Sequence, residues 1–151
     1  MEIKELVFSG YGCALQLAWK VFQEYEAPDY TEKGIKEFYE SINNPDFIKM
    51  LKIYGAFEHN KLIGILATRN SGNHIALFFV EGSYHKKGIG WQLFHRACLD
   101  NTSGSITVNS SPFAIEVYHH LGFRDTDIEQ TTNGIRYTPM ICDINKPIQE
   151  L

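Results

Sequence analysis

The spacing of hydrophobic residues predicts one strand and two helices at the beginning of the chain. Residues 3–7 alternate loosely, as in a strand, and apolar residues then recur at helical intervals from Ala14 to Tyr25. After a break at residues 26–29, Thr31 suits the N-cap of a second helix. Its apolar positions recur at i, i+3, i+4 and i+7, and Pro45 ends the pattern.

Runs of apolar and β-branched residues predict the first strands of a sheet. Residues 53–58 and 61–68 flank His59-Asn60, the arrangement expected of a hairpin. Residues 75–80 are apolar without alternation, which is typical of a strand covered on both faces. We therefore expect this strand to lie in the middle of the sheet.

Helices and strands alternate in the following segment. Residues 88–100 carry one helical stripe, and residues 105–109 return as a strand, which together complete a β-α-β unit. Ser111 and Pro112 suit the N-cap and first position of a short helix, which Gly122 ends.

A hairpin is expected at the end of the chain, and Asn133-Gly134 is its turn signal between residues 127–132 and 135–143. Pro139 predicts that the last strand lies at a sheet edge at that point. The resulting order, β-α-α-β-β-β-α-β-α-β-β, describes an α/β fold with a mixed sheet. No linker or repeat divides the chain, so we expect residues 1–151 to form a single domain.

Composition narrows the class of protein. The 14 Lys and Arg residues against 18 Asp and Glu residues give a net charge of −4, which argues against a general nucleic-acid binder. The longest apolar run is too short to cross a bilayer, and the first residues do not resemble a signal peptide. The three cysteines form no CxxC pair. We therefore expect a cytoplasmic protein that binds neither membranes nor nucleic acid.

No metal site is expected either. The histidines form no H-E-x-x-H motif and no Cys/His cluster. Ser110-Ser111 lacks a G-x-S-x-G elbow, so these residues indicate a helix cap and not a nucleophile.

The segment with the clearest chemical meaning is residues 77–90, a buried strand that leads through a Gly- and Lys-containing loop into a helix. Gly88 and Gly90 let the backbone approach a ligand, and the first helical N–H groups attract an anion. Lys86 and Lys87 add local positive charge. The P-loop and G-x-G-x-x-G spacings are both absent. The residues alone leave an ordinary strand-to-helix turn as an equal alternative.

This segment resembles motif A of the GNAT acetyltransferase superfamily, [Q/R]-x-x-G-x-[G/A]. His85-Lys-Lys-Gly88-Ile-Gly90 matches it at every position except the first. Residues 108–123 are similar to the second signature of the superfamily, and Tyr137-Thr-Pro-Met140 resembles its common final strand. The resemblance covers nearly the whole chain and implies a GNAT-like, mostly antiparallel sheet flanked by helices.

The resemblance implies that acetyl-CoA is the cosubstrate. Backbone N–H groups from His85 to Gly90 would hold the pyrophosphate, and Lys86 or Lys87 would reach the outer phosphates. Pantetheine would lie between splayed strands and pair with residues 78–80, with Asn109 orienting a water or a pantetheine amide. The expected cofactor-binding residues are Phe78, Phe79, Val80, His85, Lys86, Lys87, Gly88, Ile89, Gly90, Asn109, Ala114 and Tyr118.

The same resemblance implies a direct transfer to an amine in a ternary complex. Tyr118 would be the general acid for the departing thiolate, and the Val80 N–H would donate to the oxyanion. Glu81 is the first choice for the base, with a solvated loop carboxylate as the equal alternative.

Acceptor recognition is expected from the loop between the first two helices, where carboxylates and tyrosines would receive a cationic amine. Its candidate residues are Glu24, Tyr25, Glu26, Asp29 and Tyr30, and ordinary solvated loop charges are the slightly favoured alternative. The leading function is an N-acetyltransferase acting on a small primary amine. A protein N-terminal or lysine acetyltransferase and a non-catalytic acyl-CoA-binding regulatory module remain alternatives, and a homodimer is left open.

Overall fold

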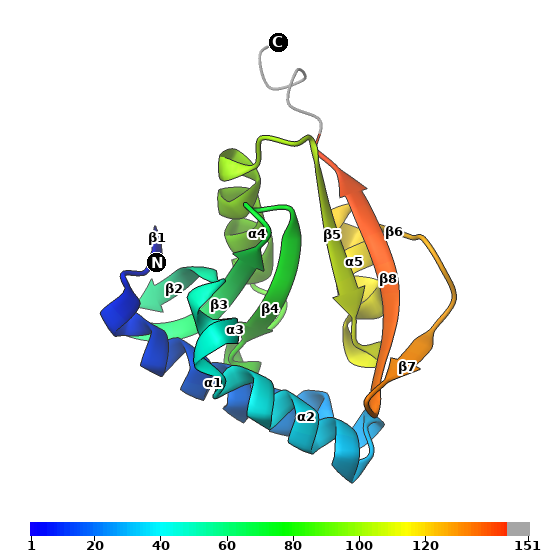
Figure 1. The fold of residues 1–151 in the computed structure, drawn as a ribbon. Helices are drawn as coiled ribbons and strands as arrows, with labels where there is room; N and C mark the ends of the chain where they lie inside the picture. Colours follow the sequence, from blue (N-terminus) through cyan, green and yellow to red (C-terminus); the bar gives the residue numbers. More distant parts are fainter. Residues whose placement is uncertain (145–151) are drawn as a thin grey trace.

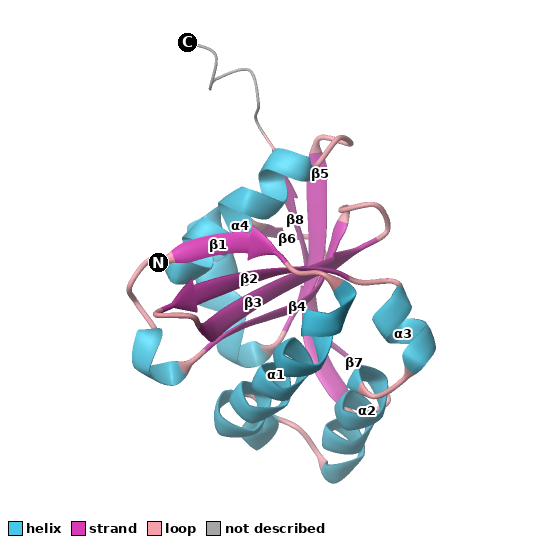
Figure 2. Ribbon diagram, turned by 90° about the vertical axis from the view of Figure 1, so that its left-hand side faces the viewer, coloured by secondary structure: helices cyan, strands magenta, loops and turns pink. Residues whose placement is uncertain are grey.

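Helices cover both faces of a mixed sheet in the computed structural model, which describes residues 1–144 (Figures 1 and 2). The sheet order is β1-β2-β3-β4-β5-β8-β6, and β7 pairs with β8. The strands are β1 (Glu2–Glu5), β2 (Lys52–Glu58), β3 (Lys61–Arg69), β4 (His74–Val80), β5 (Ser105–Ser110), β6 (Arg124–Asp125), β7 (Gln130–Thr132) and β8 (Ile135–Asp143). The α-helices are α1 (Tyr11–Tyr25), α2 (Glu32–Ile42), α3 (Pro45–Lys49), α4 (Ile89–Asp100) and α5 (Ile115–Leu121). Within residues 1–144, no helix is both long enough and apolar enough to span a membrane.

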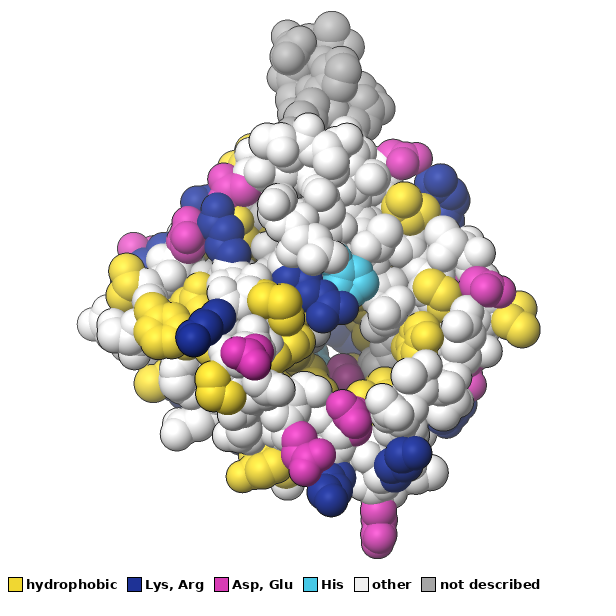
Figure 3. Space-filling model, viewed as in Figure 1, with side chains coloured by type: hydrophobic (Ala, Val, Ile, Leu, Met, Phe, Trp, Pro, Cys, Tyr) yellow, Lys and Arg dark blue, Asp and Glu magenta, His cyan; other side chains and the backbone are white. Residues whose placement is uncertain are grey.

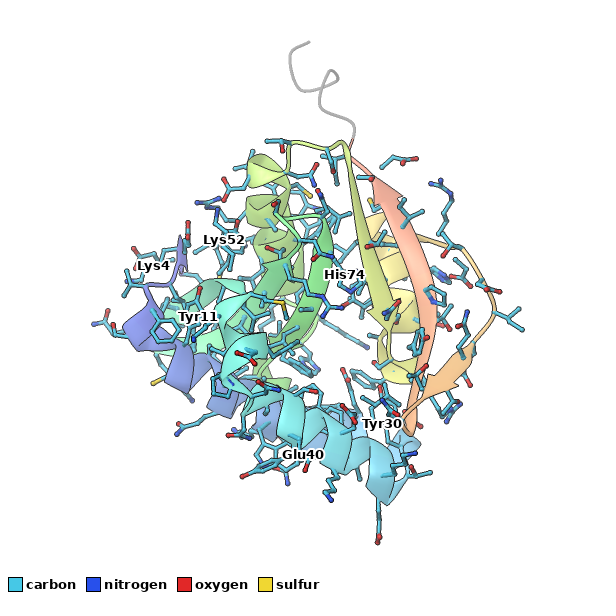
Figure 4. All side chains as sticks on the ribbon, in the orientation of Figure 1. Lys4, Tyr11, Tyr30, Glu40, Lys52 and His74 are labelled. Atoms are coloured by element: carbon cyan, nitrogen blue, oxygen red, sulfur yellow. The ribbon has the colours of Figure 1, made fainter. Side chains whose placement is uncertain are left out.

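The sheet opens between its two central strands. All strand pairs are antiparallel except β4 with β5, whose register contains the two pairs His74↔Thr107 and Ile75↔Val108. Beyond this point β4 and β5 diverge, as Figure 1 shows. The His74 ring nitrogen Nδ1 lies 2.7 Å from the Thr107 hydroxyl at the closed end of the opening, where Figure 4 labels His74.

One core joins α1 and α2 to the sheet. The buried stripe of α1, predicted from its spacing, packs on apolar residues of β2, β3 and β4, and the partly buried Phe38 of α2 packs against the same cluster. Two aromatic rings of this core stack closely, because the ring centroids of Phe22 and Phe38 lie 4.0 Å apart. A second core covers the opposite face, where α4 and α5 contribute Leu93, Phe94 and Tyr118. Figure 2 shows α1 and α2 on one side of the sheet and α4 on the other.

The last hairpin is fastened to α2 by a backbone contact. Asn133 and Gly134 have positive φ angles of 53° and 80°, as the predicted turn requires. A Cβ on Gly34 would lie 2.2 Å from the Gly134 carbonyl oxygen, so only glycine permits this approach. The β7–β8 turn is thereby held beside the second helix, at the open end of the sheet.

Two short elements were not predicted from the sequence, and the cap predicted at Ser111 does not form. Helix α3 begins at Pro45, where the second helix was expected to end, because Asn44 caps it through the Asp46 N–H. β6 is the other addition. Ser111 makes no cap hydrogen bond, and a 3₁₀ turn (Pro112–Ala114) precedes α5.

The edge position predicted for Pro139 is confirmed at that point, because no strand pairs with Pro139 on the side away from β5. β8 has β5 on one side, where Asn109 faces Pro139, and β6 and β7 on the other. Proline is tolerated because it falls between the segments paired with β6 and β7. Its carbonyl accepts from the Thr126 N–H at 2.9 Å.

The central position predicted for β4 is confirmed by the sheet order. Its two faces are not equally covered, however. Leu77 and Phe79, on the face covered by α1 and α2, are buried, whereas Phe78 and Val80 on the other face are half-buried. The half-buried residues line cavities at the opening between β4 and β5.

Candidate active site

The loop before α4 presents a row of free backbone amides. Gly88 is the N-cap of α4 with a φ of 80°, and the first helical bond runs from the Gln92 N–H to the Gly88 carbonyl at 3.1 Å. Among residues 1–144, no acceptor pairs with the amides from Lys86 to Trp91, whereas the His85 amide donates to Gly82 at 3.2 Å. This arrangement is suited to binding a phosphate or diphosphate.

A cavity of about 540 Å³ extends from this loop into the opening between the strands. It is bounded by the end of α1, by β4, by the loop and start of α4, and by α5. Figure 3 shows the molecular surface hollowed between β4 and β5, with hydrophobic and acidic side chains inside the hollow. Every predicted cofactor-binding residue lines this first cavity except Lys87 and Asn109. The Lys87 ammonium instead lies 5.6 Å from the Tyr84 ring centroid.

The end of β4 directs one backbone N–H into the opening. The Glu81 N–H donates to Ile63 of β3 at 2.8 Å, so the preceding residue, Val80, turns its N–H and carbonyl towards β5. The Val80 carbonyl accepts from the His85 ring at 2.7 Å. The Val80 N–H has no acceptor among the described residues and faces the opening between β4 and β5.

Three rings from different elements gather beside the first cavity. Tyr25 of α1 lies 4.8 Å from His85 and 5.2 Å from Phe113, between ring centroids. All three residues line the cavity. Phe113 was not predicted, because its role depends on a contact between segments far apart in the sequence.

A second cavity, of about 200 Å³, lies on the α2 and β8 side of the opening. It shares five lining residues with the first cavity: Glu26, Phe78, Phe79, Ala114 and Tyr118. Tyr30 and Asn109 line only the second cavity. Figure 4 shows Tyr30 at the open end, near α2 and β8. The shared residues are therefore where a ligand in one cavity would meet a ligand in the other.

Two titratable groups stand at this junction. Burial raises the pKa of Glu26 to about 7; the Ser111 side chain opposes the rise and Asp29 adds to it. Burial, with a contribution from the Glu26 charge, raises the pKa of the Tyr118 phenol above its usual range. Tyr118 is 6% exposed and lines both cavities. The phenol thus stays protonated and available to donate.

The other predicted site carboxylates lie outside both cavities. The two oxygens of Glu81 bind the Lys20 ammonium at 2.9 and 3.0 Å. Glu24 is exposed, and Asp29 accepts through its backbone from Arg136 at 3.2 Å. Of the five residues predicted for acceptor recognition, the structure brings Tyr25, Glu26 and Tyr30 to the cavities.

The residues of the second cavity could not be identified from sequence spacing. Phe38 and Ile42 of α2 looked like core positions of an amphipathic helix, and Ile135 like the start of a strand. No group of three or more His, Cys, Asp or Glu side chains that could hold a metal occurs within the described part of the chain.

Comparison with known proteins establishes the family. The family model described as Acetyltransferase (GNAT) domain matches residues 26–144, so the chain belongs to the GNAT acetyltransferases. Comparison with curated proteins gives no significant match.

Solved structures share the fold at low sequence identity. A GCN5-related N-acetyltransferase from Rhodopseudomonas palustris has a TM-score of 0.78 at 15% identity, covering 94% of each chain. The PaiA N-acetyltransferase from Thermoplasma acidophilum, in complex with coenzyme A, has a TM-score of 0.75 at 18% identity, covering 94% of this chain and 98% of that one. The ribosomal-protein-S18-alanine N-acetyltransferase from Escherichia coli has a TM-score of 0.64 at 18% identity, covering 96% and 94%.

Proposed function

We propose that this GNAT enzyme transfers the acetyl group of acetyl-CoA to a primary amine by direct attack in a ternary complex. The observation that carries the proposal is the row of free amides from Lys86 to Trp91 at the entrance of a cavity that reaches Tyr118. Coenzyme A in the complex with the Thermoplasma acidophilum relative supports the same choice of cosubstrate.

The first cavity suits a molecule with a diphosphate and a long flexible arm. Unpaired amides suit the diphosphate, and Lys86, which lines the cavity, would add positive charge for outer phosphates. The separation of β4 from β5 leaves strand edge along residues 78–80 without a partner strand, where amide groups of the arm would bind. When bound, acetyl-CoA would supply an activated acyl group and a thiolate leaving group.

Two groups are placed to assist the transfer. The Val80 N–H faces the opening, so it would stabilise negative charge on the carbonyl oxygen. The Tyr118 hydroxyl would protonate the departing sulfur, since its phenol is protonated throughout the physiological pH range. Glu81 is less well placed for the base, because Lys20 holds its carboxylate outside the cavities.

Two measurements on the wild-type protein test this function. Calorimetric titration with acetyl-CoA should detect one site per chain. Release of free thiol, followed with a thiol-reactive dye, should then depend on addition of a primary amine. Binding without release for any amine would support the non-catalytic module, and absence of binding would contradict the proposal entirely.

A further inference from the structure

The second cavity has an apolar wall built largely from aromatic rings. Phe22 packs between Phe38 and Tyr30, with ring centroids 4.0 and 5.5 Å away. Phe38 also lies edge-on to Phe79 of β4, with centroids 5.8 Å apart. The remaining apolar lining comes from Ile42, Phe47, Ile75, Ala76, Leu77, Val108 and Ile135. Such a surface favours an apolar or aromatic group on the ligand.

Of the described residues that line this cavity, Glu26 is the one with a charged side chain. The other polar groups there are neutral, on Tyr30, Ser41, Asn109, Ser111 and Tyr118. A ligand with a single positive charge is therefore matched, whereas several charges would be placed against apolar walls at a high desolvation cost.

The cavity is also small. Its volume of about 200 Å³ is below the roughly 300–1,000 Å³ of sites that hold drug-sized ligands. A ligand with one ring or one branched aliphatic group is of suitable size, and an oligosaccharide with several amino groups is not.

Glu26 lies where the two cavities meet. It lines both of them, together with Phe78, Phe79, Ala114 and Tyr118. An amine whose apolar part occupies the second cavity would thus have its nitrogen beside Glu26 and facing the first cavity.

We propose that the acceptor is a compact monoamine bearing one aromatic or branched aliphatic group, and that Glu26 removes the proton from its ammonium nitrogen. This inference rests on the proposed acetyl transfer and assigns its acceptor and its base. Glu26 is a catalytic residue in this scheme, because it contacts the reacting nitrogen.

The proton transfers balance. The ammonium gives one proton to the Glu26 carboxylate, and the neutral nitrogen attacks the thioester carbonyl carbon. The C–N bond forms and the C–S bond breaks. The sulfur takes the phenolic proton of Tyr118, and the second proton lost by nitrogen restores the phenol. Glu26 then releases its proton to water, so the products are an amide, a free thiol and one proton.

The environment of Glu26 agrees with this role. Burial, which raises the pKa of its carboxyl to about 7, makes it a stronger proton acceptor than an exposed glutamate, close to the pH at which a cell operates.

The direct test is an acceptor panel with wild-type protein and acetyl-CoA. Phenethylamine and isoamylamine represent the proposed class, spermidine and tobramycin represent polycations, and a short peptide with a free amino terminus represents a protein acceptor. We expect kcat/KM for phenethylamine or isoamylamine to exceed that for each of the others at least tenfold. A preference for a polycation or for the peptide would overturn the acceptor assignment.

Glu26→Gln tests the base. It should lower kcat/KM for phenethylamine at least a hundredfold and abolish the rise in kcat/KM through about pH 7. Glu40→Gln, an exposed position of α2 labelled in Figure 4, is the matched control and should stay within twofold. A normal pH profile in Glu26→Gln, or a comparable loss only in Glu81→Gln, would overturn the role of Glu26.

Ala76→Leu tests the cavity, because Ala76 lines the second cavity and not the first. The added side chain should lower kcat/KM for phenethylamine at least tenfold while methylamine is used within threefold of wild type. An equal effect on both amines would contradict the proposal.

Calorimetry distinguishes failure of the acceptor inference from failure of the proposed function. If wild-type protein binds acetyl-CoA but releases no thiol with the two monoamines, the acceptor inference fails and the cosubstrate site stands. If acetyl-CoA does not bind, the proposed function itself fails. Binding of acetyl-CoA by each variant also shows that the variant is folded.

Discussion

The imidazole Nε2 of His85 lies 2.7 Å from the carbonyl oxygen of Val80, and thereby joins the start of the amide-bearing loop to the end of β4. Nε2 is the donor in this bond, because a carbonyl oxygen can only accept. The His85 ring thus binds the protein's own backbone, and it packs beside the rings of Tyr25 and Phe113. The orientation of the loop relative to the opening depends on this contact.

Removing the His85 ring should therefore weaken binding of coenzyme A. We expect His85→Ala to raise the Kd of coenzyme A about tenfold, the effect of losing one buried hydrogen bond and its orienting influence. His85→Gln, whose side-chain amide can still donate to Val80, should stay within threefold. Calorimetry measures both constants. Wild-type affinity in His85→Ala would show that the bond does not position the loop.

Tyr118→Phe should separate chemistry from binding. The phenylalanine ring retains the packing of Tyr118 against Phe78 and Phe123, whose centroids lie 5.9 and 5.3 Å away. We expect kcat to fall about a hundredfold, as for loss of a general acid, with an unchanged melting temperature and a Kd for acetyl-CoA within twofold. Steady-state kinetics and calorimetry provide the comparison. Unchanged kcat would remove Tyr118 from the mechanism.

Gly34→Ala should destabilise the fold, because the new Cβ would meet the rigid backbone of Gly134 at 2.2 Å. The expected loss is about 2 kcal/mol in the free energy of unfolding, measured by chemical denaturation. Gly12→Ala is the matched helical control: nothing lies within 4 Å of its Cβ, so alanine should maintain or increase stability. Similar effects at both positions would contradict the close approach of α2 and the hairpin.

His74 should make stability depend on pH. Burial, assisted by the charge of Arg69, lowers the pKa of its imidazole from 6.5 to about 4. Between these values the unfolded chain binds more protons than the folded one, so the contribution of His74 is complete above pH 6.5 and is lost as pH falls towards 4.

The measurement is urea denaturation of wild type and His74→Gln across pH 4–7. The unfolding free energy of wild type should fall by about 1 kcal/mol more than that of the variant as pH decreases, an amount that allows for solvent screening at a partly exposed side chain. Parallel profiles would show that the imidazole is not buried in its neutral form.

Local signals identified the parts of the site that one segment builds alone. The Gly88 and Gly90 spacing predicted the loop before α4, and Asn133-Gly134 predicted the last turn, because these positions need backbone conformations that favour Gly or Asn. Asn43-Asn44-Pro45 ends the second helix as predicted, but Asn at the N-cap and Pro at the first position also begin a helix, α3, which was not predicted.

Features that need several segments were beyond the sequence pattern. Glu26 was one of five acidic and tyrosine candidates in a loop, and its distinct environment results from burial near Ser111, which follows β5. The lining of the second cavity likewise depends on how α2, β4 and β8 meet. Spacing indicated that Phe38 and Ile42 would be covered, but not that a cavity would lie beside them.

The central claim is that the amides from Lys86 to Trp91 hold the diphosphate of coenzyme A. NMR titration of ¹⁵N-labelled protein with coenzyme A tests it residue by residue. The account predicts that the largest amide shifts occur at residues 86–91, followed by residues 78–80. Saturable shifts confined to other segments, or no shifts at all, would contradict it.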